Sequence, residues 1–256
     1  MSGWNPQQYL TFEGHRLRPA MDLLARIPLH APADIVDLGC GTGNVTRILH
    51  ERWPQAKLVG VDSSAAMLSQ ARQMAIAVEW QEHDIRDWRP QERFDLIYSN
   101  AALHWLPDHE TLFPNLMGYL KPGGCLAVQM PGNFTAPTHM LVYEVARAGP
   151  WRAKLEPLIK PPPVMEPADY YWALTSHAEQ LDVWETTYTQ LLEGDNPVAE
   201  WTKGSWLKPF LDALEEPQRG RFEAEYRHRI LEAYPAGADG KTLLPFRRIF
   251  IVAQVA

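Results

Sequence analysis

The chain has 256 residues, a formal net charge of −7, a pI near 5.7 and two cysteines. The acidic balance argues against a protein that binds the nucleic-acid backbone through a basic face. Two cysteines far apart in the sequence predict neither a disulfide framework nor a zinc site. No segment has the roughly 18 apolar residues of a membrane span, and no basic stretch precedes an apolar one near the first residue. We therefore expect a cytoplasmic protein with no membrane partner.

The first half of the chain alternates short apolar runs with helical patterns. Residues 5–26 form a helical pattern interrupted at Pro19, with Leu17, Leu23 and Leu24 on its buried side. The apolar runs that follow predict strands at residues 35–38, 57–62, 78–81, 94–100 and 126–130. Strands that alternate with helices at this spacing indicate βαβ units, and hence a parallel sheet covered on both faces.

The helices between these strands can be placed from their caps and apolar spacing. Ser63 or Ser64 caps the helix after the second strand, and this helix is expected to turn Met67 inward. The helix after the fourth strand is expected to extend to Leu120, where residues 121–124 make a turn into the fifth strand.

The pattern changes after residue 131. We expect a helix over 138–147, an ordered loop at 160–172 over the ligand edge of the sheet or a plain connection, and a strand at 183–189. Helical material at 198–234 precedes a last strand at 250–255. With no linker between independent domains, we predict one domain over residues 1–256, comprising an N-terminal helical segment (1–30) and insertions at 134–180 and 196–235 over the ligand edge.

The most informative stretch follows the first predicted strand. It reads Asp37-x-Gly-x-Gly-x-Gly43, an acid followed by glycines at alternate positions. Glycine has no Cβ, so such a backbone can turn sharply and let a ligand approach its amides. The GxGxxG spacing of a dinucleotide loop is absent, because Asn44 and Thr46 stand where a third glycine is required. No lysine follows, so this is not a phosphate-binding P-loop either.

Together with Asp62, which closes the second predicted strand, this loop resembles the S-adenosylmethionine site of class I methyltransferases. The resemblance implies an α/β, Rossmann-like fold with a seven-stranded, mostly parallel sheet, helices on both faces and a helical insertion or lid. It also implies that Asp37 takes up the donor's ammonium group and that the Asp62 carboxylate accepts both ribose hydroxyls. The residues implied to bind the donor are Asp37, Gly39, Gly41, Asp62, Ser63, Met67, Asp84, Ile85 and Asn100.

Beyond the loop, nearly the whole chain resembles the trans-aconitate 2-methyltransferases. The shared elements are Trp4-Asn-Pro-x-x-Tyr-Leu-x-Phe12, Arg16-x-Arg-Pro-Ala20, Asp37-Leu-Gly-Cys-Gly41, Trp105-Leu-Pro-Asp-His109, Leu126-Ala-Val-Gln-Met-Pro-x-Asn133, Pro137-Thr-His139, Asp182-Val-Trp-x-Thr-Thr-Tyr188 and Arg248-Ile-Phe-Ile-Val-Ala253. The chain departs from the family pattern at His104, where glutamine is common, and at Arg247, where a proline commonly precedes the arginine. The segment after the fourth strand lacks the Pro-Pro-aromatic element of enzymes that methylate base amines, so we expect no nucleic-acid partner.

The resemblance implies methyl transfer to one carboxylate of a small unsaturated tricarboxylic acid, giving a monoester and S-adenosylhomocysteine. A carboxylate is already ionised at neutral pH, so we expect no catalytic base and no metal, and a mechanism that works by positioning. The spare carboxylates need cationic or polar partners, because guanidinium groups match carboxylate geometry. The candidates are Tyr9, Arg16, Arg18, His104, Trp105, His139 and Arg248.

Alternatives remain open from the sequence. For each arginine a surface ion pair is as plausible as a substrate role, and for Tyr9 core packing is an equal competitor. The chain could instead methylate a neutral metabolite with His104 or His139 as general base. It could also bind the donor without catalysis, as a regulatory module.

Overall fold

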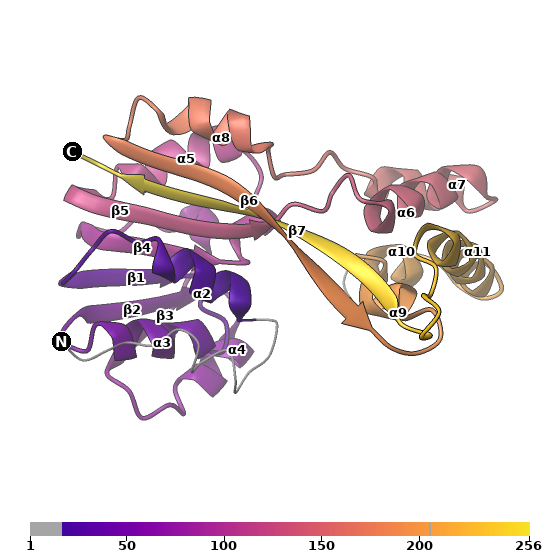
Figure 1. Ribbon diagram of the computed structural model, residues 1–256, viewed down its shortest axis with the longest axis horizontal. Helices are drawn as coiled ribbons and strands as arrows, with labels where there is room; N and C mark the ends of the chain where they lie inside the picture. Colours follow the sequence, from indigo (N-terminus) through magenta and orange to yellow (C-terminus); the bar gives the residue numbers. More distant parts are fainter. Residues whose placement is uncertain (1–16, 205) are drawn as a thin grey trace. The chain divides into compact units, whose positions relative to one another are not determined.

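The computed structural model describes residues 17–204 and 206–256 and divides them into two compact units (Figure 1). The first, called the sheet unit, comprises the described residues up to Pro131 together with Pro163–Thr186 and Arg248–Ala256. The second, called the helical unit, comprises Gly132–Pro162 and Thr187–Arg247. Residues 163–180, which we expected within an insertion, therefore belong to the sheet unit. That the insertions lie over the ligand edge stays a prediction.

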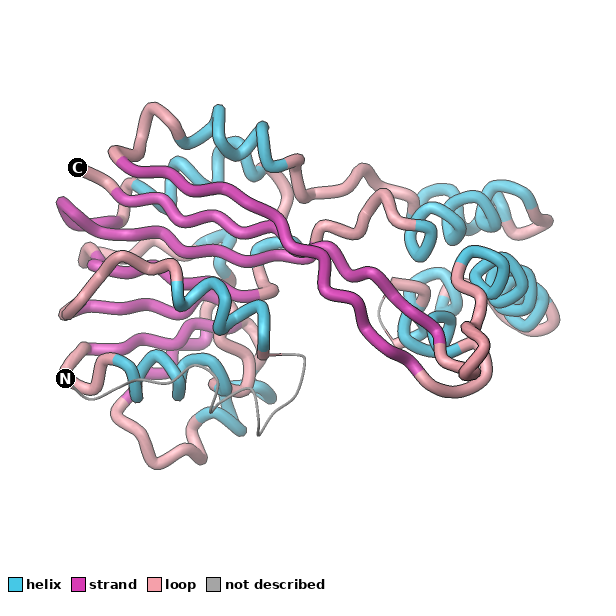
Figure 2. The backbone as a smooth tube through the Cα atoms, in the orientation of Figure 1, coloured by secondary structure: helices cyan, strands magenta, loops and turns pink. Residues whose placement is uncertain are grey.

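The strands form one seven-stranded sheet in the order β3-β2-β1-β4-β5-β7-β6 (Figure 2). They are β1 (Asp34–Leu38), β2 (Lys57–Asp62), β3 (Val78–Glu82), β4 (Phe94–Asn100), β5 (Leu120–Pro131), β6 (Gln180–Leu192) and β7 (Thr242–Gln254). The first five pair in parallel, and β7 runs antiparallel to β5. This mostly parallel sheet confirms the predicted fold class, and it brings the carboxyl ends of β1, β2 and β4 to one edge.

Helices cover both faces of the sheet unit, as predicted. They are α2 (Arg18–Ala25), α3 (Asn44–Arg52), α4 (Ala65–Ala71), α5 (His109–Met117) and α8 (Pro167–Leu174), with 3-10 turns η2 (Ile85–Asp87) and η3 (Leu103–Trp105). On one face, Tyr98 donates to the Ala20 carbonyl of α2 and Asp37 accepts from Thr46 of α3. On the other face, Val128 of β5 shares a buried cluster with Phe113 of α5 and with α8. The strands β1, β2, β4 and β5 are mainly buried, as strands of a covered parallel sheet should be.

The helical unit has its own core. Its helices among the described residues are α6 (Pro137–Ala148), α7 (Arg152–Leu155), η4 (Glu156–Leu158), α9 (Pro197–Lys203), α10 (Lys208–Asp212) and α11 (Gln218–Ala233). Trp151 packs edge-on against Phe222 with ring centroids 5.4 Å apart, and both side chains are buried. The buried hydroxyl of Tyr226 donates to the Thr138 carbonyl at 3.1 Å and to Thr202 Oγ1 at 3.0 Å. One residue of α11 thus ties α6 to α9.

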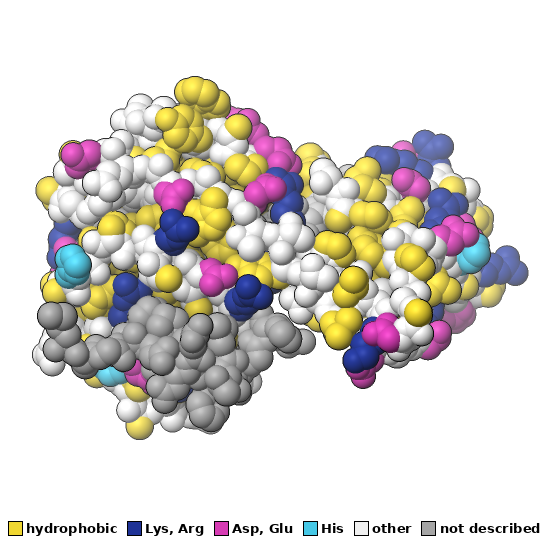
Figure 3. Space-filling view, in the orientation of Figure 1, with side chains coloured by type: hydrophobic (Ala, Val, Ile, Leu, Met, Phe, Trp, Pro, Cys, Tyr) yellow, Lys and Arg dark blue, Asp and Glu magenta, His cyan; other side chains and the backbone are white. Residues whose placement is uncertain are grey.

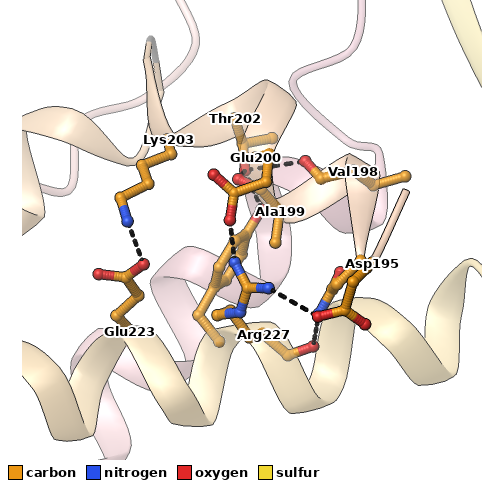
Figure 4. A network of polar contacts seen from close by, with 10 residues as sticks. Asp195, Val198, Ala199, Glu200, Thr202, Lys203, Glu223 and Arg227 are labelled. Carbon is orange, nitrogen blue, oxygen red and sulfur yellow. Dashed lines mark hydrogen bonds and ion pairs between the residues drawn. The ribbon is translucent and has the colours of Figure 1, made fainter. Parts of the chain in front are cut away.

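Polar contacts add a second tie between α9 and α11 (Figure 4). Arg227 pairs with Glu200 and with Asp195, whose carboxylate lies 3.6 Å from its Nη2. Lys203 Nζ lies 2.5 Å from Glu223 Oε1. These side chains are partly exposed, so each ion pair contributes at most about 1 kcal/mol to stability and mainly sets the register of the two helices.

The helix α2 begins at Arg18 with Pro19 in its first turn, where a proline needs no N–H partner, and the part of the predicted helical pattern before residue 17 lies outside the described residues. The structure corrects three expectations about local structure. The helix α5 ends at Met117, so Leu120 already belongs to β5, which includes residues 121–124. Met67 does not turn inward: its side chain is 44% exposed, while Leu68 and Ala71 are the buried residues of α4.

The third correction concerns residues 160–172, expected as an ordered loop or a plain connection. Their second half forms the start of α8, which a reciprocal capping box between Glu166 and Asp169 initiates. Tyr170 is fully buried and its hydroxyl lies 2.5 Å from His109 Nδ1, which fixes α8 against α5. The neighbouring Trp172 is 71% exposed, and apolar side chains gather over α8 on the surface shown in Figure 3.

Candidate active site

The glycine loop after β1 is held open by its backbone. Gly39, Gly41 and Gly43 have φ values of +76°, +56° and +83°, which residues with a Cβ rarely adopt. The amides of Gly39 and Cys40 both donate to the Val61 carbonyl, at 2.8 and 3.0 Å. The loop is therefore anchored to β2, and a Cβ at Gly41 would meet open space, so this part of the backbone is accessible to a ligand.

Asp37 is a buried carboxylate beneath this loop. Its side chain is 2% exposed, and Thr46 Oγ1 on the first turn of α3 donates to its Oδ2 at 2.6 Å. Burial raises the pKa of Asp37 to about 7, with a smaller contribution from the nearby Asp62 charge. Such a carboxylate favours a cationic ligand, since a positive charge restores the ionised form. Thr46 was not predicted as a partner of Asp37, although the helical spacing after the loop indicates that its side chain points inward.

Asp62 connects the ends of β2 and the loop. Its Oδ2 accepts from the Gly41 amide at 2.9 Å and its Oδ1 from the Ser64 amide at 2.8 Å. A carboxylate oxygen can accept more than one hydrogen bond, so each oxygen keeps capacity for a hydroxyl of a ligand. The carboxylate is thereby positioned by the chain while remaining able to bind a diol.

Four other residues predicted to bind the methyl donor follow β2 and β3 in the sequence. Ile85 is partly buried, and its Cδ1 lies 3.8 Å from where a Cβ on Gly39 would stand. Asp84 caps η2 and pairs with Arg86 at 2.6 Å, which lowers the pKa of Asp84 to about 2. Ser63 and Met67 are exposed at the start of α4, the helix that Ser64 caps.

A second group of polar residues lies at the carboxyl end of β4 and β5. Asn100 is in register with Gln129, Gln129 with Phe250, and Pro131 with Arg248. Register partners project from the same face, and side chains alternate along a strand. Asn100, Gln129 and Arg248 therefore share the face that carries Tyr98, the register partner of Asp37. We call Asn100, His104, Gln129 and Arg248 the edge cluster.

The edge cluster contains buried polar atoms that lack partners. In the described part of the chain, Asn100 Oδ1, His104 Nδ1 and both amide atoms of Gln129 are buried without a hydrogen-bond partner. His104 follows β4 in η3, and its ring lies tilted against that of the 69% exposed Trp105, with centroids 4.6 Å apart. Burial, followed by the charge of Arg248, lowers the pKa of His104 to about 3. This histidine is neutral at physiological pH.

The remaining predicted acceptor residues are Tyr9, Arg16, Arg18 and His139. Tyr9 and Arg16 lie outside the described residues. Arg18 is exposed at the start of α2, 4.0 Å from Asp22. His139 belongs to the helical unit, where it packs against Trp206 with centroids 4.4 Å apart. Burial lowers the pKa of His139 to about 4.

The described residues offer neither a metal centre nor a membrane-spanning helix. Within residues 17–204 and 206–256, no group of three or more His, Cys, Asp or Glu side chains is placed to hold a metal ion. Of the helices that the structure describes, none has both the length and the hydropathy needed to cross a bilayer.

Comparisons with known proteins agree with this geometry. A family model described as a methyltransferase domain matches residues 35–124, from β1 into β5. The trans-aconitate 2-methyltransferase of Azoarcus sp. (strain BH72) is 49% identical over 253 residues, which cover 99% of this chain and 99% of that protein. The trans-aconitate 2-methyltransferase of Rhodopseudomonas palustris (strain BisB18) is 45% identical, with 99% of each chain covered.

Among solved structures, the YcgJ protein from Bacillus subtilis matches with a TM-score of 0.59 at 14% identity, covering 94% of this chain and 99% of that one. A likeness at that identity concerns the fold alone, whereas the near full-length similarity to the two relatives above confirms the resemblance predicted from the sequence. The chain therefore belongs to the trans-aconitate 2-methyltransferase family of S-adenosylmethionine-dependent methyltransferases.

Proposed function

We propose that this enzyme transfers the methyl group of S-adenosylmethionine to one carboxylate of trans-aconitate or a close tricarboxylic acid. The observation that carries the proposal is the 49% identity over 99% of the chain to a relative of that name. We call residues 37–43 together with Asp62 the donor loop. This loop accounts for binding of the methyl donor, and the edge cluster accounts for binding of the acid.

The residues of the loop suit the donor. The buried Asp37 carboxylate, with its pKa near 7, pairs with the ammonium group of the amino-acid part. The Asp62 carboxylate accepts the two ribose hydroxyls with the capacity that the Gly41 and Ser64 amides leave free. The open space above Gly41 admits the ligand to the backbone, and Ile85 offers an apolar contact for the adenine.

The edge cluster suits the acid. Arg248 supplies a guanidinium, which pairs with a carboxylate through two parallel hydrogen bonds. Asn100, at the end of β4, lies between the loop and this arginine in the order of the strands, so an acid held by Arg248 can extend toward the donor loop. His104 adds no charge, because its pKa is about 3. Arg18, His139, and Tyr9 and Arg16 outside the described residues, remain candidates for the spare carboxylates.

Catalysis in this proposal is positioning. When bound, the donor supplies an electrophilic methyl carbon: the carboxylate oxygen forms a bond to it, the carbon–sulfur bond breaks, and its electron pair stays on sulfur, giving the ester and S-adenosylhomocysteine. The chain has to hold the oxygen in line and exclude water, and proximity of this kind can lower a barrier by about 7 to 11 kcal/mol. Because the reacting carboxylate and the sulfonium become a neutral ester and a neutral thioether, a low-dielectric environment around these two groups also favours the reaction.

The alternative with a neutral acceptor requires a general base. The two histidines proposed for it have pKa values of about 3 and 4, well below the neutral range in which a base is efficient. The structure therefore favours the carboxylate acceptor, which needs no base.

The test is an acceptor panel. The enzyme is incubated with methyl-labelled donor and di- and tricarboxylic acids, with a phenol and a primary alcohol as neutral comparators. We expect base-labile methyl ester from trans-aconitate and close acids only. No ester from any acid would overturn the proposal, and turnover of the neutral compounds with an essential base near pH 6 to 7 would favour the alternative.

A further inference from the structure

Gln129 is a buried residue whose side-chain amide has no partner in the described part of the chain. It is 1% exposed, and within the described chain neither Oε1 nor Nε2 has a hydrogen-bond partner. Its backbone, in contrast, is engaged: the carbonyl accepts from Ala101 N at 2.9 Å. Buried amides normally satisfy both ends, so this side chain requires an explanation.

The described residues around Gln129 do not supply a structural explanation for its unpaired amide. The strand neighbours Val128 and Met130 are fully buried apolar residues that fill the opposite layer. On the face of Gln129, its register partner Phe250 is stacked on Trp184 with centroids 4.8 Å apart and an angle of 7°. An apolar residue would satisfy this position at lower cost, because it removes two unpaired polar atoms from the interior.

The same face contains the other members of the edge cluster. Asn100, on the donor side of Gln129, also has a buried oxygen without a partner in the described residues. Arg248 lies one register step beyond Gln129, opposite Pro131, on the side away from Asn100. Gln129 therefore stands between the residue nearest the donor loop and the cation that the acid requires.

We infer that Gln129 is an acceptor-binding residue, whose Nε2 donates to the carboxylate that receives the methyl group. The inference rests on the proposed function and adds a residue to it. A neutral donor orients the attacking carboxylate without pairing its charge, so the carboxylate stays nucleophilic, whereas Arg248 binds the acid through full charge. The other end of the amide, Oε1, remains available to an O–H or N–H donor such as a water that enters with the acid.

The test is Gln129→Met, which keeps the length of the side chain and removes its hydrogen bonds. We expect the KM for trans-aconitate to rise about 10- to 100-fold, as for loss of a hydrogen bond to a charged group. Donor affinity, measured by calorimetry, should stay within about twofold. The melting temperature should stay equal or rise, because the unpaired atoms are gone. A merely structural residue would instead lose stability.

The matched control is Gln254→Met. Gln254 lies near the far end of β7, where its Nε2 donates to the Gly123 carbonyl at 2.9 Å. The same substitution there removes a satisfied hydrogen bond, so we expect an equal or lower melting temperature and an unchanged KM. A second variant, Gln129→Glu, places an anion beside the acceptor: the KM should rise further at neutral pH and fall as the pH is lowered and Glu is protonated.

The outcomes separate the two proposals. Ester formation by the natural enzyme with an unchanged acceptor KM in Gln129→Met overturns this inference alone, as does an equal loss of donor and acceptor affinity. No ester from any acid with the natural enzyme overturns the proposed function and this inference with it.

Discussion

The donor loop and the edge cluster lie on the same edge of one sheet and are built in opposite ways. In the donor loop the chain satisfies its own polar groups: Thr46 donates to Asp37, and the Gly41 and Ser64 amides donate to Asp62. In the edge cluster, Asn100, His104 and Gln129 keep buried atoms that nothing in the described chain pairs.

This difference separates what the fold needs from what the acceptor needs. Hydrogen bonds within the donor loop fix its geometry before any ligand arrives, and the cost that remains there is the buried charge of Asp37, which a cationic ligand relieves. The edge cluster instead retains the desolvation cost of unpaired groups, which a polar ligand relieves on binding. We therefore expect changes in the loop to act on the donor and changes in the cluster to act on the acceptor.

The largest effect is expected for Asp62→Asn. The variant removes the charged acceptor of the ribose hydroxyls and turns an amide N–H toward a backbone N–H, so donor affinity should fall at least about 100-fold by calorimetry. The control is Asp95→Asn, at the opposite edge, where Asp95 Oδ2 accepts from the Ala33 and Asp34 amides at 2.8 Å each. That variant should lower the melting temperature and leave donor affinity intact. Equal losses of donor affinity would contradict a ligand role for Asp62.

The second largest effect is expected for Arg248→Met, which removes the cation of the edge cluster. The KM for the acid should rise about 10- to 50-fold, while donor affinity changes less than about twofold. Arg247→Met is the control, because adjacent strand residues point to opposite faces and the Arg247 guanidinium contacts the Gly132 carbonyl at 3.5 Å. If donor affinity falls as much as acceptor affinity in Arg248→Met, the arginine is structural and the separation of the two regions fails.

A moderate effect concerns the pH dependence of stability without ligands. The folded chain raises the pKa of Asp37 from 3.8 to about 7, so between these values the folded state binds the proton more tightly than the unfolded state. The contribution of Asp37 to the free energy of unfolding therefore decreases as the pH rises from 3.8 toward about 7. Asp37→Asn should remove this dependence, raise the melting temperature at pH 7 and abolish donor binding. Denaturant unfolding across this range is the measurement, and an unaltered pH slope in the variant would refute it.

The smallest effect is expected for His104→Gln. Since the pKa of His104 is about 3, the histidine is already neutral at pH 7, and a neutral amide should change kcat/KM less than about threefold. At saturating donor, kcat should be flat between about pH 6 and 8 for both proteins. If the kcat of the variant no longer reached a plateau at alkaline pH, His104 would instead have a role in proton transfer.

Local patterns predicted the elements that the chain defines by itself. The strands at 57–62 and 94–100 have the predicted bounds, because turn signals flank short buried runs. Asp37 and Asp62 could be predicted because the loop and strand ends that carry them are read directly from the sequence. The first residue of β5 could not be predicted. Lys121-Pro-Gly-Gly124 has the composition of a turn, but it joins the strand through a register shift opposite Phe94–Leu96.

Which side chains meet in the edge cluster depends on strand register, and local sequence patterns do not reveal that register. Gln129 reads as one polar residue in an apolar strand, and only its pairing with Asn100 and Phe250 shows that it belongs with Arg248. The burial of Tyr170 likewise follows from its contact with His109, a residue 61 positions earlier. Tertiary contacts of this kind override the local composition that suggested a loop.

The fit between Gly39 and Ala102 has an evolutionary consequence. A Cβ on Gly39 would stand 2.1 Å from the Cβ of Ala102, in the segment that leads from Asn100 to His104. The two positions are thus interlocked: no side chain can enter at Gly39 unless the segment after β4 moves. A lineage that gains a side chain at Gly39 must therefore change the segment around Ala102 in the same step, whereas residues beyond Ala102 can vary while the glycine stays.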